Sequence, residues 1–195
     1  MSGLVVVLAQ FFAGCLIVPI PAALSQQQFN TRWRALRRPT QLQAPLQWRD
    51  WLLDPGSLTK RLIQLSKGHF RVEVLRQRWA IPTASERKAL GMRCREKALI
   101  REVQLIGNDQ AWVYARSILP ATTLTGRQRI LSQLGTRPLG QMLFQDPTMR
   151  RGPLQVSELH LHTGESAWAR RSVFTLADKP LLVCEVFLPA LLQVE

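Results

Sequence analysis

Acidic residues and cysteines are scarce in this sequence. Only 13 Asp and Glu stand against 26 Lys and Arg, which gives the chain of 195 residues a formal net charge of +13. The three cysteines are an odd number whose spacing fits neither a disulfide framework nor a zinc site, and this usage is typical of a reducing compartment. A basic chain favours anionic partners, namely nucleic acid, a membrane surface or a small polyanionic ligand.

Several functional motifs are also absent. The chain has no internal repeat, no Gly-rich phosphate loop, no Gly-x-Ser-x-Gly elbow and no His-Glu-x-x-His pair. Arg32, Arg34, Arg37 and Arg38 form a cluster, but no zinc-finger, helix-turn-helix or aromatic-stacking signature accompanies them. We therefore expect a generally basic surface, no nucleic-acid partner and no metal site.

The N-terminus has an unusual composition. Residues 1–31 carry no charged side chain, and residues 3–24 are strongly apolar. A secretory signal would have basic residues before the apolar run, and there are none. The run is long enough for a membrane anchor, which needs about 20 apolar residues, but Pro19 and Pro21 interrupt it. A start codon assigned too far upstream would also produce such a segment.

We therefore divide the chain into an apolar extension, residues 1–30, and one domain, residues 31–195. Whether the extension is an anchor, a signal or a misassigned start stays open. Either an anchor or a misassigned start leaves the domain in the cytoplasm, because the arginine cluster behind an inserted segment stays on the cytoplasmic side. Any membrane association is expected to come from residues 3–24.

The pattern of apolar residues predicts an α+β fold with an antiparallel sheet, since helices come early and in the middle and the strands follow one another. Residues 82–91 are expected to be a loop with one helical turn. Turns at residues 107–110 and 177–179 each indicate a hairpin. The predicted helices are 47–53, 58–66 and 124–134, and the predicted strands are 70–81, 97–106, 111–119, 154–162, 168–176 and 181–188.

Glu185 is a lone carboxylate in the apolar strand 181–188. A buried carboxylate loses hydration and persists only where something pairs with it or donates hydrogen bonds to it. Two interpretations stay open. Glu185 could address a polar group of a small ligand in an apolar cavity, or it could lie on an exposed edge or pair with an arginine of a neighbouring strand.

Two arginines also lie within apolar strands. An unpaired guanidinium would be costly at Arg101 or at Arg116. Residues 136–140 form a tight turn into a helix, where backbone N–H groups are free to hold an anion. Together with Glu185, these groups suit an aromatic acid that carries both a carboxylate and a hydroxyl group. The alternative is that they pair with one another in a structural ion-pair network.

Six segments in order resemble the bacterial chorismate pyruvate-lyases, over about residues 31–189. Each segment is weak evidence alone, but six in register are specific. The apolar N-terminus lies outside the resemblance. The segments are Trp51-Leu-Leu with Ser57-Leu-Thr-Lys-Arg61, Arg101-Glu, Ala115-Arg-Ser-Ile-Leu-Pro120, Arg137-Pro-Leu-Gly140 with Leu143-Phe144, Trp168-Ala-Arg-Arg171-Ser, and Lys179-Pro-Leu-Leu with Glu185-Val-Phe-Leu-Pro189.

The resemblance implies a monomeric domain with a six-stranded antiparallel sheet and helical flaps over an internal ligand site. It implies conversion of chorismate to 4-hydroxybenzoate and pyruvate for ubiquinone biosynthesis, without metal or organic cofactor. The Arg101 guanidinium and the backbone N–H groups of Leu58 and Leu139 would hold the aromatic carboxylate, and Glu185 would bind the ring hydroxyl. The family often has Met where this chain has Leu58, and a backbone contact survives that change.

The chemistry of the implied reaction assigns further roles. Chorismate is a dianion, and the basic chain would attract it. Arg116 is our candidate for the enolpyruvyl side, and Glu185 is positioned to orient the hydroxyl group or to accept the ring proton; the sequence does not decide between these. The alternative function is a non-catalytic, ligand-sensing domain of the same fold that binds an aromatic acid.

Overall fold

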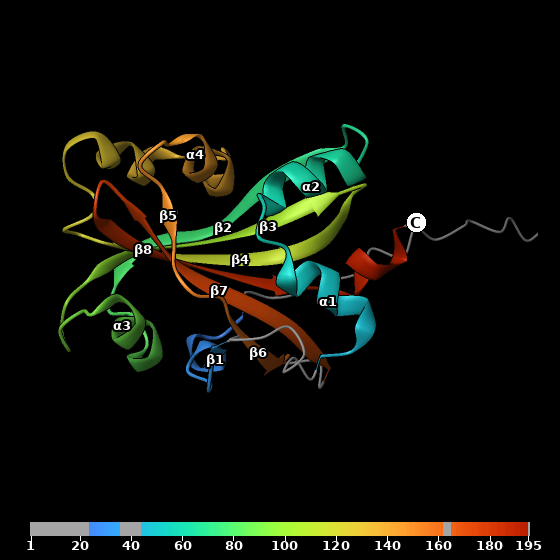
Figure 1. The fold of residues 1–195 in the computed structure, drawn as a ribbon, viewed down its shortest axis with the longest axis horizontal. Helices are drawn as coiled ribbons and strands as arrows, with labels where there is room; N and C mark the ends of the chain where they lie inside the picture. The colour runs from blue at the N-terminus through green and yellow to red at the C-terminus, as the bar shows by residue number, and fades with distance from the viewer. Residues whose placement is uncertain (1–23, 36–43, 162–164, 195) are drawn as a thin grey trace, which may run out of the picture.

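The fold is known from a computed structural model that describes residues 24–35, 44–161 and 165–194 (Figure 1). These residues form a single antiparallel sheet of eight strands in the order β1-β6-β7-β8-β4-β3-β2, with β5 paired to β7. The strands are β1 (Arg34–Ala35), β2 (Phe70–Ala80), β3 (Ala98–Gly107), β4 (Gln110–Pro120), β5 (Arg150–Arg151), β6 (Gln155–His160), β7 (Ser166–Leu176) and β8 (Lys179–Phe187).

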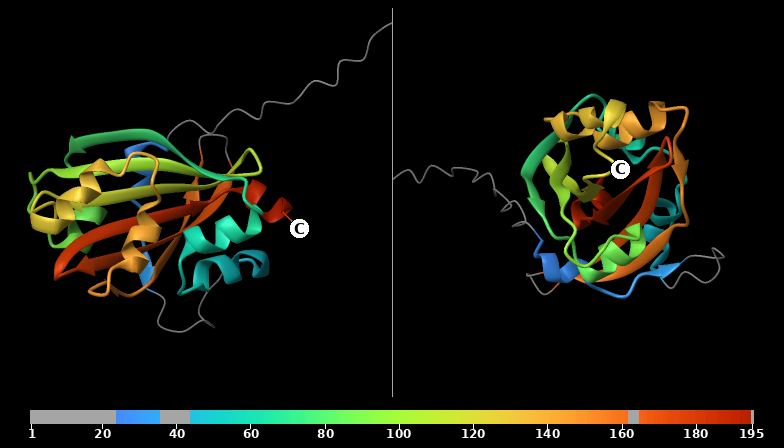
Figure 2. Two further views of the ribbon diagram at one scale, coloured as in Figure 1. Left: turned by 90° about the horizontal axis from the view of Figure 1, so that it is seen from above. Right: turned by 90° about the vertical axis from the view of Figure 1, so that its left-hand side faces the viewer.

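Helices cover both faces of this sheet. The views agree that α2 and α4 lie over one face and α3 over the other (Figures 1 and 2). The α-helices are α1 (Leu46–Leu53), α2 (Leu58–Leu65), α3 (Ala84–Leu90) and α4 (Leu139–Gln145), and the 3-10 helices are η1 (Gln26–Phe29), η3 (Gly126–Gln133) and η4 (Pro189–Gln193).

The α+β class and the antiparallel sheet are confirmed, but the expected number of strands was wrong. The six long strands are those predicted from the sequence. The short strands β1 and β5, of two residues each, are the two additional members of the sheet. Strands this short leave no alternating pattern to detect, because alternation needs at least four residues.

Two helical segments also differ from expectation. Residues 84–90 form the helix α3 and not a single turn, since Thr83 and Glu86 close a capping box at its start and Gly91 ends it in the left-handed conformation. Residues 126–133, expected to be α-helical, form the 3-10 helix η3.

Turn chemistry fixes the register of the hairpins. Asn108 and Asp109 join β3 to β4 with φ of 49° and 61°, and Ala177 and Asp178 join β7 to β8 with φ of 46° and 64°. Two residues with positive φ match the twist of a tight hairpin. A Cβ at Gly107 would lie 2.1 Å from the Trp112 ring, so only glycine fits beside that fully buried side chain.

The domain begins earlier than residue 31. Leu24 and Phe29 are buried, and they pack with Tyr114 and Val186 against the face of the sheet on which α3 lies. Part of the predicted extension, residues 24–30, therefore belongs to the folded domain. The apolar run before Leu24 lies outside the described residues.

Candidate active site

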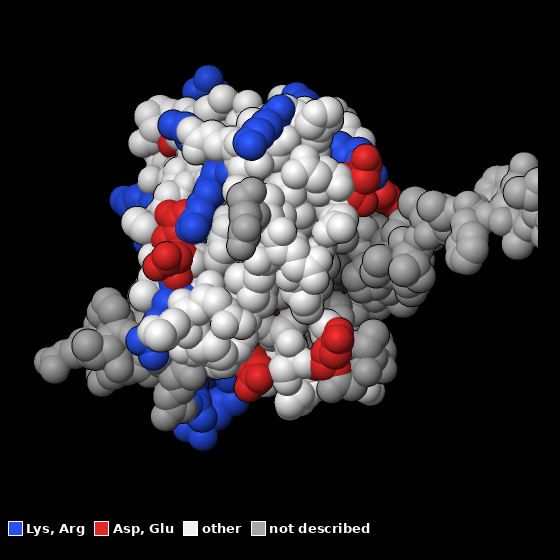
Figure 3. Space-filling model, turned by 90° about the vertical axis from the view of Figure 1, so that its right-hand side faces the viewer, with Lys and Arg blue, Asp and Glu red and all other residues white. Residues whose placement is uncertain are grey.

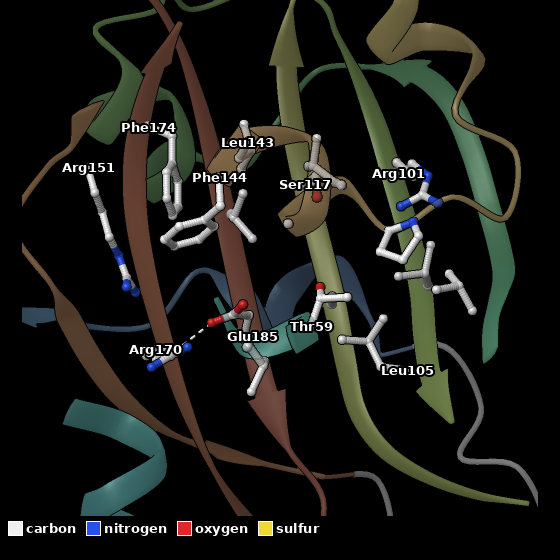
Figure 4. Close-up of a pocket in the computed structure, with 18 of the residues that line it drawn as sticks. Thr59, Arg101, Leu105, Ser117, Leu143, Phe144, Arg151, Arg170, Phe174 and Glu185 are labelled. Carbon is white, nitrogen blue, oxygen red and sulfur yellow. Dashed lines mark hydrogen bonds and ion pairs between the residues drawn. The ribbon is translucent and has the colours of Figure 1, made fainter. Parts of the chain in front are cut away.

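A pocket lies between the sheet and the helices α2 and α4 (Figure 4). Most of its lining is apolar, and the charged members are three arginines and one glutamate. The lining residues are Gly56, Leu58, Thr59, Val72, Arg101, Val103, Leu105, Ala115, Ser117, Pro138, Leu139, Gly140, Leu143, Phe144, Arg151, Arg170, Phe174, Val183 and Glu185.

Strand alternation selects which side chains reach this pocket. Directly paired residues of neighbouring strands share a face of the sheet. Arg101 pairs with Ser117, and Ala115 pairs with Glu185, which pairs with Arg170. All of these line the pocket, so one face of β3, β4, β8 and β7 forms its floor.

Arg101 is buried in the pocket with an exposed fraction of 1%. Its Nη2 donates to the carbonyl oxygens of Gly135 (2.8 Å) and Arg137 (3.2 Å), while its Nε is buried without a partner among the described residues. No described carboxylate forms an ion pair with it. Burial lowers the pKa of Arg101 to about 10, so the group is charged at neutral pH. An unneutralised buried cation with a free donor is a binding position for an anion.

The helices over the pocket begin at the two residues predicted as backbone donors. Leu58 is the first residue of α2 and Leu139 the first residue of α4, and both line the pocket. The N–H groups in the first turn of a helix have no partner within the helix. Both residues therefore lie where a backbone N–H can serve a ligand.

The two helices meet above the pocket at Gly140 and Thr59. A Cβ built at Gly140 would lie 2.8 Å from Thr59 Oγ1, closer than van der Waals contact allows. Glycine therefore lets α2 and α4 approach without displacing Thr59, and residues of both helices line the pocket on the side away from the sheet.

Glu185 lines the pocket and is also paired. Arg170 Nε donates to its Oε2 at 2.6 Å, and Arg170 Nη1 donates to the carbonyl oxygens of Trp51 and Asp54, both at 2.7 Å. The exposed fraction is 18% for the Glu185 side chain and 1% for that of Arg170. The two interpretations of Glu185 are thus compatible, because one oxygen is held by an arginine of the neighbouring strand and the carboxylate still faces the pocket.

The structure corrects the position expected for Arg116. It pairs with Glu102 and Cys184 across the sheet, and it is absent from the pocket lining because alternation turns it to the opposite face. There its guanidinium is bonded to Glu86 at 2.8 and 3.2 Å and to Glu102. Arg116 therefore does not face the enolpyruvyl side of a ligand in this pocket, and the ion-pair alternative holds for this residue.

Sequence reasoning missed two arginines of the pocket. Arg170 and Arg151 line it beside Glu185 (Figure 4). Arg170 could have been found, because the predicted hairpin around residues 177–179 places it opposite Glu185. Arg151 belongs to a strand of two residues and gives no periodic signal.

The described residues contain no group of three His, Cys, Asp or Glu arranged to hold a metal ion. None of the helices in this part of the chain is long and apolar enough to cross a membrane. On the face shown in Figure 3, basic and acidic side chains are scattered and do not form one continuous basic patch.

The chain resembles proteins of known families. A sequence model of the family described as "Chorismate lyase" matches residues 28–194. A "Probable chorismate pyruvate-lyase" of Aromatoleum aromaticum is 42% identical over 173 residues, which are 81% of this chain and 93% of that protein. The "Probable chorismate pyruvate-lyase 2" of Pseudomonas entomophila is 45% identical over 150 residues, which are 74% of this chain and 81% of that protein.

A solved structure shares the fold at low identity. The C-terminal domain of the histidine utilization repressor from Pseudomonas syringae pv. tomato has a TM-score of 0.51 and 13% identity, and the match covers 62% of this chain and 92% of that one. This likeness concerns the fold alone. Because the family model and these relatives match most of its length, the chain belongs to the chorismate lyase family.

Proposed function

We propose that this protein is a chorismate pyruvate-lyase, which eliminates pyruvate from chorismate to give 4-hydroxybenzoate for ubiquinone biosynthesis. The observation that carries the proposal is the pocket, in which a buried, unneutralised Arg101 and the carboxylate of Glu185 face one apolar space. The relatives named as chorismate pyruvate-lyases support the same assignment.

Arg101 binds the ring carboxylate in this proposal. Its buried Nε is without a partner among the described residues, so a bound carboxylate both neutralises the charge and satisfies the donor. The backbone N–H groups of Leu58 and Leu139 complete the carboxylate site from the helices above the pocket.

Glu185 binds the opposite end of the ring. The strand β4 lies between β3 and β8, and Arg101 pairs with Ser117 while Glu185 pairs with Ala115. Two strand spacings and an offset of two residues separate their backbones by roughly 12 Å. Two side chains and one six-membered ring with para substituents span such a distance. Glu185 then accepts a hydrogen bond from the ring hydroxyl group.

The elimination needs a base and an oriented leaving group. The C4 proton is removed, the electrons of that C–H bond complete the aromatic ring, and the C3–O bond breaks to release enolpyruvate, which becomes pyruvate on protonation at carbon. Glu185 is our candidate for the group that accepts the C4 proton, because Arg170 holds one of its oxygens and keeps the carboxylate oriented. Arg101 fixes the ring so that the reacting carbons lie beside Glu185.

The alternative is a non-catalytic domain that binds an aromatic acid. One observation favours it: the fold is shared with a domain of a repressor protein. The pocket and the paired Glu185 suit ligand binding as well as catalysis, so only a measurement of turnover distinguishes the two functions.

We further propose that the protein acts as a monomer in the cytoplasm, without cofactor or nucleic-acid partner. The three cysteines have no spacing typical of a disulfide framework, which supports a reducing compartment. Any membrane association would come from residues 3–24.

The test is incubation of the purified full-length protein with chorismate in excess chelator. We expect equal amounts of 4-hydroxybenzoate and pyruvate. Tight binding of 4-hydroxybenzoate without pyruvate release would establish the sensing alternative, and loss of activity in chelator would overturn the metal-free mechanism.

A further inference from the structure

One charged group of the pocket has no role in the reaction described so far. Arg101 serves the ring carboxylate, and Arg170 is paired with Glu185. Arg151 remains as a third guanidinium in the lining. Chorismate carries two carboxylates, and the proposed function accounts for only one of them.

Arg151 is held so that part of its guanidinium stays free. Its Nε donates to Ser172 Oγ at 3.1 Å and its Nη1 donates to the carbonyl oxygen of Pro55 at 3.1 Å. The guanidinium carbon lies 5.3 Å from the centre of the Phe174 ring. Its Nη2 has no hydrogen bond to a described residue, and no described carboxylate forms an ion pair with Arg151. The group is therefore oriented by uncharged partners and retains its charge for a ligand.

The surroundings of Arg151 disfavour its positive charge unless an anion is bound. Burial, together with the nearby positive charge of Arg170, lowers the pKa of Arg151 below its ordinary value. Two carboxylates, Glu185 and Asp54, also act on Arg151, but Glu185 is paired with Arg170 and Asp54 with Arg61. The charge of Arg151 is therefore left without a carboxylate of its own. The second carboxylate of a ligand bound here would supply one.

The position of Arg151 agrees with the layout of the substrate. Figure 4 shows Arg151 and Arg170 on the side of Glu185 away from Arg101. In chorismate the enolpyruvyl ether is on C3, directly beside the C4 hydroxyl group and away from the ring carboxylate on C1. With C1 toward Arg101 and C4 toward Glu185, the carboxylate of the ether side chain extends toward Arg151.

We propose that Arg151 binds the enolpyruvyl carboxylate of chorismate, the role that the sequence had suggested for Arg116. This inference rests on the proposed function. It makes Arg151 the residue that contacts substrate but not the aromatic product, because 4-hydroxybenzoate lacks the second carboxylate. Release of pyruvate then removes the only ligand of Arg151, while Arg101 and Glu185 still hold the product.

The test compares Arg151→Met with Arg150→Met. Methionine keeps an unbranched stem that packs against Phe174. Arg150 precedes Arg151 in β5, is 70% exposed and pairs with Asp178, so the same substitution there is the matched control. Calorimetry would use two ligands: 4-hydroxybenzoate, and 3-(1-carboxyethoxy)-4-hydroxybenzoate, which carries a second carboxylate through an ether beside the hydroxyl group.

We expect Arg151→Met to lower kcat/KM for chorismate and affinity for the dicarboxylate by roughly 100-fold, as expected when one partner of a buried charge pair is removed. Affinity for 4-hydroxybenzoate should change by less than about threefold, which also shows that the variant is folded. For Arg151→Lys, kcat/KM and affinity for the dicarboxylate should lie between those of Arg151→Met and the wild type. Lysine keeps the positive charge but not the planar guanidinium group. Arg150→Met should match wild type throughout.

Equal losses for both ligands in Arg151→Met would overturn the inference, and so would unchanged turnover. Both outcomes leave the proposed function intact as long as the wild type releases pyruvate. A wild type that binds both ligands without turning over chorismate would overturn the proposed function, while the ligand comparison would still test Arg151.

Discussion

Arg170 and Glu185 face each other across β7 and β8, with Arg170 Nε 2.6 Å from Glu185 Oε2. Arg170 is fixed in turn by the carbonyl oxygens of Trp51 and Asp54 at the end of α1. The pair explains how a carboxylate persists in an apolar strand. It also gives Glu185 a fixed direction, because Arg170 holds one of its oxygens, and the other accepts no hydrogen bond from the described residues.

The first prediction concerns Glu185→Gln. The amide keeps the volume and can still bond to both Arg170 and the ring hydroxyl group, but it cannot accept the C4 proton. We expect kcat to fall by about 100-fold or more, as for loss of a general base, with 4-hydroxybenzoate still bound. Steady-state kinetics and calorimetry measure these two quantities. Turnover within a few-fold of wild type would restrict Glu185 to binding, and a collapse of the melting temperature would make it a structural residue.

The second prediction concerns Arg101. We expect Arg101→Ala to weaken 4-hydroxybenzoate binding by roughly 2–5 kcal/mol, since it unpairs a buried carboxylate. Arg101→Lys should also bind weakly, because an ammonium group does not reproduce the bidentate geometry. Arg137→Ala is a suitable control, since Arg137 contributes its backbone carbonyl to Arg101 and not its side chain. Near-normal affinity in both Arg101 variants would contradict the assignment.

Much of this site could be predicted from the sequence, because a charged residue within an apolar strand is unusual and indicates a specific role. Arg101 and Glu185 were found as charges within apolar strands, and both line the pocket. The turn at residues 136–140 indicated backbone donors near Leu139. Leu58 was identified only through the family resemblance, because a backbone donor leaves no mark in the side-chain sequence.

The errors have equally physical causes. Arg116 gives the same signal as Arg101, but the two lie on opposite faces of the sheet. The apolar pattern of a strand buried on both faces does not tell which face holds the ligand. Arg151 was missed because it acts from a two-residue strand, whose place beside Phe174 is set by tertiary structure alone.

The third prediction concerns the contact between the helices above the pocket. Gly140→Ala places a methyl group 2.8 Å from Thr59 Oγ1, so the Thr59 side chain or the helix that carries it must shift. We expect weaker retention of 4-hydroxybenzoate and a faster dissociation rate, both measurable by stopped-flow fluorescence. The double variant with Thr59→Ala gives a control, because it removes the oxygen that the new methyl group would meet and should restore retention. An unchanged dissociation rate in Gly140→Ala would show that the helices open independently of this contact.

The fourth prediction separates Arg116 from the site. Burial disfavours its charge, but the hydrogen bonds and charges of Glu86 and Glu102 raise the pKa of Arg116 above its ordinary value. Arg116→Ala removes the buried partner of two buried carboxylates, and Glu102 keeps only its pair with the exposed Arg76. We therefore expect a loss of about 3–5 kcal/mol in the free energy of unfolding, measured by urea denaturation. Because Arg116 faces away from the pocket, the folded fraction should retain its affinity for 4-hydroxybenzoate. If Arg116→Ala has normal stability but impaired chorismate turnover, Arg116 takes part in the reaction, and the placement of its side chain on the opposite face is wrong.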